Sequence, residues 1–165
     1  MYISTQFKII VVINIIGTYE CKADAKGRVM FPAALKKQLE KVTSEGFVIK
    51  RSVFNQCLEI HPMKEWNQVV KQVNQLNRFV KKNNDFIRMF TAGVKVIELD
   101  STGRLLLPKD LQSFSKINKE IVLSSSGNMI EIWNKNSYEQ IINNENIDFA
   151  TLAEDVMGSK DNKDD

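Results

Sequence analysis

Two copies of a short motif hold the residues best suited to chemistry, Asp-x-x-Gly-Arg at 24–28 and again at 100–104. The aspartate of such a motif can accept backbone N–H bonds at the start of a turn, and its glycine permits a left-handed backbone. The arginine then projects from the start of a strand with a planar fork of five N–H donors. Two such forks on one face would suit phosphates or guanine edges in a major groove. Arg28 and Arg104 are therefore the candidate binding residues of the chain.

Other residues are expected to hold the two turns and to add positive charge beside the arginines. The residues expected to hold the turns are Asp24, Gly27, Asp100 and Gly103. Lys22 and Lys26 lie beside the first arginine, whereas the second copy has Glu98 and Thr102 at these positions. We therefore expect the first copy to make the stronger contact with DNA, through Arg28, Lys26 and Lys22. The alternative is structural, with each arginine paired only to the aspartate of its own turn.

The other residue types and motifs of the chain give little support for enzymatic activity. The chain has a single histidine, His61, and its two cysteines, Cys21 and Cys57, form no CxxC pair. Neither a phosphate-binding GxxxxGK[ST] loop nor a GxGxxG loop occurs. We therefore expect no catalytic residue, no metal, no cofactor and no small-molecule substrate, and we interpret His61 as a structural residue.

Length and charge describe an ordinary folded domain with a basic body. The 165 residues are 43% hydrophobic and 26% charged, enough for one compact domain or two very small ones. The formal net charge is only +3. Residues 154–165 hold five acids and two lysines, a net of −3, which leaves +6 for the rest of the chain. The body is therefore basic enough to suit an acidic partner.

The cysteine content and the apolar stretch at 9–16 bear on location. Two unpaired cysteines fit a reducing cytoplasm, and eight residues are too few to span a membrane. We expect a cytoplasmic protein with no membrane partner. A rival interpretation is a signal peptide cleaved near Ala23-Asp24-Ala25, and a third is an edge strand or an extension from an upstream start codon.

The motif belongs to a longer internal repeat. Residues 24–32 return as 100–108 at an offset of 76, and the matches continue downstream at offsets of 74 and 72. Each copy predicts a strand, a glycine turn and a second strand, in the pattern of a hairpin. Pro32 and Pro108 then open a short helix, and two further strands follow. A unit this small cannot bury much alone, so we expect both copies to share one core as a pseudo-twofold pair.

Helices are expected between and after the copies. Apolar residues at three- and four-residue spacing predict an amphipathic helix over 62–80, ended by Asn83-Asn84-Asp85, with a further turn or two over 86–90. A helix should start near Asn134, and a last one should follow Asp148. Their exposed apolar stripes favour a closed homo-oligomer.

The order GTYECKADAKGRVMFPAAL, LDSTGRLLLPKDL and FATLAEDVMG resembles the MraZ family of bacterial regulators over nearly all of 17–158. The resemblance implies an α+β, β-dominated fold: two AbrB-like (SpoVT-AbrB) repeats forming one pseudo-twofold swapped-hairpin, or double-split, β-barrel with flanking helices. It implies DNA contacts by Arg28 and Arg104, with Lys26 beside the first. The expected segments are an extension (1–16), a first repeat (17–64), a helical connector (65–92), a second repeat (93–147), a C-terminal helix (148–158) and a disordered tail (159–165).

The resemblance also implies a role. It predicts a cytoplasmic, nucleoid-associated transcription regulator, usually a repressor, that binds short direct repeats in its own promoter, upstream of the division and cell-wall genes. The expected partners are double-stranded DNA and further copies of the chain in a ring, an octamer or larger. Two alternatives remain open: a ring-forming scaffold of division or wall synthesis, and an antitoxin-like DNA binder of the same fold.

Overall fold

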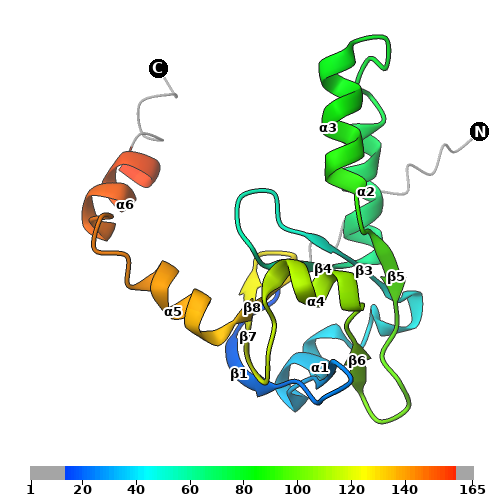
Figure 1. Cartoon of the computed structure of the whole chain (residues 1–165), viewed down its shortest axis with the longest axis vertical. Helices are drawn as coiled ribbons and strands as arrows, with labels where there is room; N and C mark the ends of the chain where they lie inside the picture. Colours follow the sequence, from blue (N-terminus) through cyan, green and yellow to red (C-terminus); the bar gives the residue numbers. More distant parts are fainter. Residues whose placement is uncertain (1–13, 159–165) are drawn as a thin grey trace, which may run out of the picture. The chain divides into compact units, whose positions relative to one another are not determined.

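The computed structural model describes residues 14–158, and the chain divides into two compact units, residues 1–135 and 136–165. The first unit contains every strand of the described part of the chain (Figure 1). The expected tail at 159–165 lies outside the described residues. So does most of the expected extension, although Ile15 is buried in the core and donates its N–H to the carbonyl of Gly127.

The strands form two antiparallel sheets. The larger has the order β1-β7-β8-β4-β3-β5, and the smaller pairs β2 with β6. In the larger sheet the strands are β1 (Thr18–Lys22), β7 (Glu120–Ser126), β8 (Met129–Asn134), β4 (Leu58–Pro62), β3 (Phe47–Arg51) and β5 (Lys95–Ile97). In the smaller they are β2 (Arg28–Met30) and β6 (Arg104–Leu106). With the helices described below, the fold is mixed α+β and strand-rich.

Strand register relates the two repeats by a local twofold symmetry. Val29 faces Leu105 in the small sheet, and Glu59 faces Glu131 in the large one. Each pair joins matching positions of the two copies, so a pseudo-twofold axis passes through both pairs. The order of the large sheet also reads the same from either end when the copies are exchanged.

The hairpins predicted within each copy are wrong. Strand β1 pairs with β7 and β2 pairs with β6, while the first copy's own two strands share only the bridge between Ala23 and Val29. The reason is that each turn swings the chain out of one sheet and into the other, where the second copy supplies the partner strand. This pairing gives two sheets and does not establish the closed swapped-hairpin barrel.

Two short helices close the core beneath the sheets. Helices α1 (Ala33–Leu39) and α4 (Lys109–Ser115) begin directly after the two prolines, as the sequence predicts, and a 3-10 turn, η1 (Thr43–Glu45), precedes β3. The apolar side chains of the two helices and the inward residues of β2 and β6 belong to one hydrophobic core. The fully buried core residues from these four elements include Val29, Leu35, Leu39, Leu105 and Leu111.

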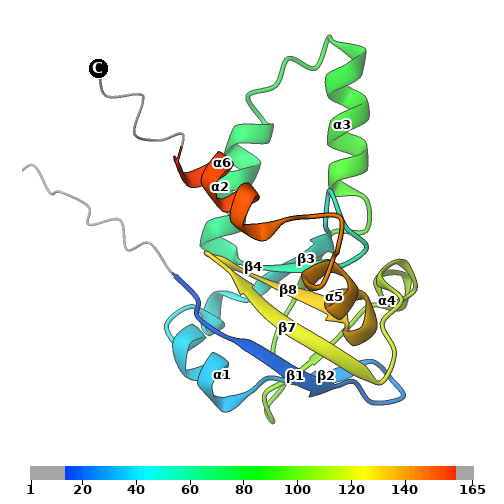
Figure 2. The same cartoon turned by 90° about the vertical axis from the view of Figure 1, so that its left-hand side faces the viewer.

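The helix expected over 62–80 ends at residue 73, and the further turns expected over 86–90 belong to a second helix that begins at Lys81. Helix α2 (Met63–Val73) and helix α3 (Lys81–Thr91) lie side by side (Figures 1 and 2), with Trp66 stacked on Phe90. The side chain of Asn77 accepts the N–H of Phe79, and that of Asn83 donates to the Asn77 carbonyl. Asparagine side chains therefore build the turn between the helices, and Asn83 continues α3 where it was predicted to break a helix.

The second unit consists of helical segments. Helix α5 (Lys135–Ile142) starts at the predicted place, and α6 (Phe149–Met157) follows Asp148, whose carboxylate accepts a bond from the Thr151 hydroxyl. Neither helix holds a buried residue. Across residues 14–158, every helix is too short or too polar to cross a membrane.

Candidate nucleic-acid interface

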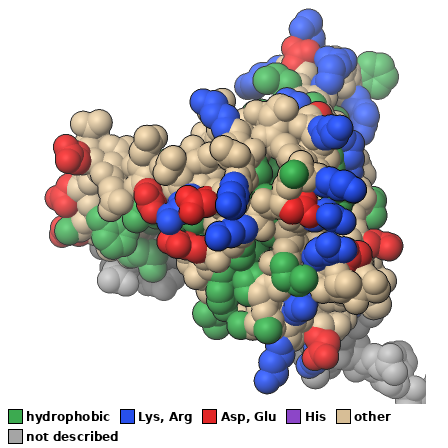
Figure 3. Space-filling model, turned by 60° about the horizontal axis from the view of Figure 1, so that its bottom comes forward, with side chains coloured by type: hydrophobic (Ala, Val, Ile, Leu, Met, Phe, Trp, Pro, Cys, Tyr) green, Lys and Arg blue, Asp and Glu red, His purple; other side chains and the backbone are tan. Residues whose placement is uncertain are grey.

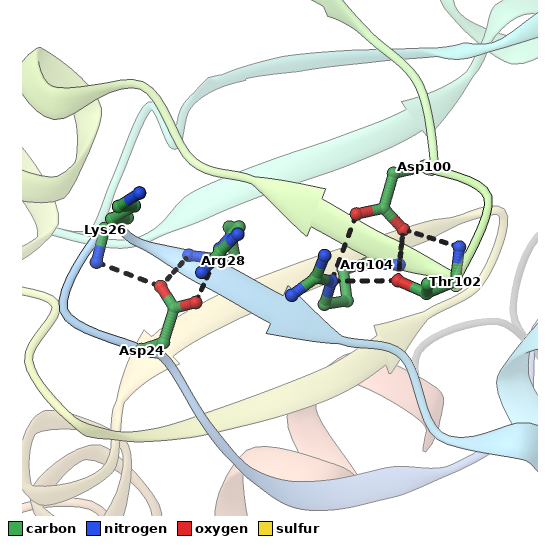
Figure 4. A network of polar contacts seen from close by, with 6 residues as sticks. All are labelled: Asp24, Lys26, Arg28, Asp100, Thr102 and Arg104. Carbon is green, nitrogen blue, oxygen red and sulfur yellow. Dashed lines mark hydrogen bonds and ion pairs between the residues drawn. The ribbon is translucent and has the colours of Figure 1, made fainter.

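The two arginines share the outward face of the small sheet. In the β2–β6 ribbon Arg28 pairs with Leu106 and Arg104 pairs with Met30, so all four point to the side opposite the buried Val29. The arginines are diagonal neighbours, which places them about 7–8 Å apart at the backbone. Figure 4 shows the two on adjacent strands, each beside its own turn. The ribbon therefore brings together the residues that the sequence separates by 76 positions.

Each arginine leaves a turn that its aspartate organises. Asp24 Oδ1 accepts the backbone N–H of Lys26 and of Arg28, both at 2.9 Å. Asp100 Oδ1 accepts the N–H of Thr102 and of Arg104 at the same distance. The two copies of the motif thus build the same turn, as the sequence predicts, and fix the backbone from which each arginine projects.

Glycine is required in both turns. Gly27 and Gly103 have φ of +84° and +81°, where L side chains are strained. A Cβ on Gly27 would lie 2.0 Å from Gln112 Nε2, and one on Gly103 would lie 2.7 Å from Lys36 Nζ. Each turn therefore packs against the helix of the other repeat.

The structural alternative is also present, because each arginine pairs with its own aspartate. Arg28 Nε lies 2.6 Å from Asp24 Oδ2, and Arg104 Nε lies 3.1 Å from Asp100 Oδ2. These contacts use only Nε. The arginine side chains keep about a third of their surface exposed, 35% and 34%, and their terminal nitrogens make no hydrogen bond within residues 14–158. The aspartates thus orient the guanidinium groups and leave their outer edges available to a ligand.

The turns hold both aspartates in the charged form. For Asp100 the N–H of Arg104 is the main cause and the Thr102 hydroxyl the next, and together they lower its pKa to about 2. For Asp24 the N–H of Arg28 is again the main cause, and its pKa lies below the usual value although partial desolvation opposes the shift. Each turn therefore keeps a fixed negative charge against its arginine at neutral pH.

Beside the first turn lies a hollow of about 900 Å³ whose charged lining residues are mostly basic. Lys26 and Arg28 line it together with Lys95, Lys109 and one acid, Glu98. Figure 3 shows Lys and Arg side chains following one another across the face that it brings forward, with single acidic side chains between them. The arrangement suits a polyanion that contacts the first turn.

The sequence analysis did not identify three lysines that lie beside the two turns. Lys95 and Lys109 belong to the second repeat yet lie beside the first turn, and Lys36 of the first repeat lies beside Gly103. Motif spacing does not reveal these lysines, because each lies beside the turn of the other repeat. Lys22 lines a separate hollow of about 300 Å³, together with Glu20, Glu120 and Lys135.

The chain is similar to known proteins over most of its length. The family model described as "MraZ protein, putative antitoxin-like" matches residues 15–89 and again residues 89–159. A protein of Christiangramia forsetii named "Transcriptional regulator MraZ" is 64% identical over 149 residues, which cover 90% of this chain and 96% of that protein. Proteins of the same name from Flavobacterium psychrophilum and Cytophaga hutchinsonii are 63% and 36% identical, over 88% and 86% of this chain and 93% of each relative. The chain therefore belongs to the MraZ family.

Proposed function

We propose that the chain is a DNA-binding transcriptional regulator that reads the major groove with the β2–β6 ribbon. One observation carries the proposal: Arg28 and Arg104 lie on one outward face, each held at Nε by an aspartate with its terminal nitrogens turned to solvent. The relatives named as transcriptional regulators support it.

A two-stranded ribbon has the right dimensions for this task. The major groove of B-DNA is about 12 Å wide and admits such a ribbon, and an arginine fork fits the O6 and N7 acceptors of guanine. With Nε held by the turn, each fork meets the base end-on through its two terminal nitrogens. Met30 and Leu106 are exposed between the forks, where apolar side chains would meet thymine methyl groups.

Lysines around the ribbon complete the proposed contact. Lys26, Lys95 and Lys109 beside the first turn and Lys36 beside the second would meet phosphates on either side of the groove. Such contacts set the register of the protein on the duplex without reading sequence. The first turn has more of them, so we propose that the surface beside the first turn anchors the chain and that the surface beside the second turn adds a weaker contact.

We further propose that several copies act together, as a cytoplasmic, nucleoid-associated ring that represses its own promoter. Short direct repeats in the DNA would each take one ribbon, and linking several modules raises the overall affinity without any new contact. Repression then follows from occupation of the promoter, and the mechanism needs no cofactor.

A mobility shift tests the proposal. The DNA immediately upstream of the gene is compared with the same DNA carrying scrambled repeats, for the native chain and for R28A/R104A. The matched control is K71A/R78A, which removes two exposed cations from α2 and the turn that follows it. We expect R28A/R104A to lose the preference for native repeats and K71A/R78A to keep it. Full affinity of R28A/R104A for the native repeats would overturn the assignment.

A further inference from the structure

An apolar groove on the first unit has no role in the ribbon described above. It is a cavity of about 450 Å³ between the β3–β4 loop and α3. Phe54, Phe86 and Met89 expose 91%, 43% and 78% of their surface beside it, while Phe90 and Phe114 line it from within. A contiguous patch of large, exposed apolar side chains marks a binding site for another molecule or another copy of the chain.

The groove also holds an unsatisfied donor. Nε of Arg51 is buried and has no hydrogen-bond partner among the described residues, and its guanidinium lies over the Phe114 ring, 4.8 Å from the centroid. The side chains that line the groove include a second cation, Lys50, and no acid within residues 14–158. A buried donor without a partner is costly, so the groove suits an apolar ligand that carries a carboxylate.

Helix α6 has the complementary surface. Its large apolar side chains recur at three- and four-residue spacing on one side, and all are exposed: Phe149, Leu152, Val156 and Met157. Glu154 and Asp155 flank this stripe, and the described segment 148–158 carries acids but no lysine or arginine. The helix is thus amphipathic and acidic, opposite in charge to the groove.

We propose that α6 of one copy docks in this groove of the next copy. The exposed residues at i, i+3 and i+7 would fill the groove as anchors, and a flanking carboxylate would meet Arg51. The helix spans about 13 Å, enough to lie along a cavity of this size. A head-to-tail contact of this kind closes into a ring when the rotation between copies permits. The inference rests on the proposed oligomer and names the surfaces that build it.

Cross-linking tests which copy supplies the helix. Cys21 is replaced by Ser, and Cys57 is left in place because it is buried and burial raises the pKa of its thiol to about 12. A chain with Met89→Cys is mixed with a chain with Leu152→Cys and treated with a short bis-maleimide. The control replaces Met89→Cys by Phe79→Cys, a fully exposed position that does not line the groove.

We expect covalent dimers in the first mixture and a large loss of them in the control. Dimers absent from the first mixture, with cross-linked monomers formed by the double variant M89C/L152C, would show docking within one chain and overturn the proposal. Copies that remain assembled without any cross-link would overturn it too, because another surface would then hold them.

Light scattering and DNA binding separate this inference from the proposed function. L152D places a charge in the stripe, and T151D places the same charge on the opposite side of α6. We expect L152D to reduce the assembly to the mass of the monomer with an unchanged circular dichroism spectrum, and T151D to remain assembled. The monomeric variant should still bind a single DNA repeat weakly, whereas R28A/R104A should stay assembled and lose its DNA binding. An assembled L152D variant would contradict the inference alone.

Discussion

Loss of one arginine from the ribbon should weaken binding to the native DNA repeats in a sequence-dependent way. A bidentate contact with guanine discriminates by about 1–3 kcal/mol, so R28A or R104A should each lower the affinity for native repeats by about 5- to 150-fold. The fold should tolerate the change, because each side chain is a third exposed and its ion pair lies at the surface.

Salt dependence tells a base contact from a phosphate contact. Fluorescence anisotropy with native and scrambled repeats, each at several salt concentrations, gives both the affinity and its slope against salt. If Arg28 reads a base, R28A loses affinity for native repeats and binds scrambled DNA as before. If Arg28 contacts a phosphate, R28A lowers the affinity for both DNAs by the same factor. The slope of log affinity against log salt concentration then falls in magnitude by about one. Unchanged affinity for both DNAs, with the assembly intact, would refute the assignment.

Three further predictions concern the turns. Because the pKa of Asp100 is about 2 in the fold against an ordinary 3.8, its turn stabilises the folded state above about pH 4, and this contribution is lost as the pH falls towards 2; an NMR titration of the carboxyl carbon measures it, and a midpoint near 3.8 would contradict it. G103A should destabilise the chain by more than about 1 kcal/mol in urea unfolding, since φ at this position is +81°, where an L side chain is strained; an unchanged unfolding midpoint would speak against the turn geometry. K36A should lower the affinity for native and scrambled DNA equally and leave the unfolding midpoint unchanged. A lower affinity for native repeats alone would make Lys36 a base-reading residue.

The turns could be predicted from sequence because they are local. Asp24, Gly27 and Arg28 lie within five residues, and the conformation of the segment depends on backbone bonds that these residue types make themselves. Strand pairing could not be predicted in the same way. Val29 pairs with Leu105, and nothing near either residue shows that its partner lies in the other copy. The predicted hairpins were wrong for this reason, although the strands of each copy follow in the predicted order.

The same limit applies to the candidate site. Arg28 and Arg104 could be identified because their motif repeats, and the structure places them on one face. The lysines around them reach the turns from the opposite repeat, as Lys36 does at Gly103. Side chains exchanged across a pseudo-twofold axis are adjacent only after folding, so motif spacing does not reveal them.

Removal of a single acceptor atom from the DNA tests the ribbon most directly. Repeats in which guanine is replaced by 7-deazaguanine lack the N7 acceptor that an arginine fork needs in the major groove. We predict that this replacement weakens binding of the native chain and has no effect on the residual binding of R28A/R104A. An equal loss for both chains would mean that neither arginine reads guanine and would contradict the account.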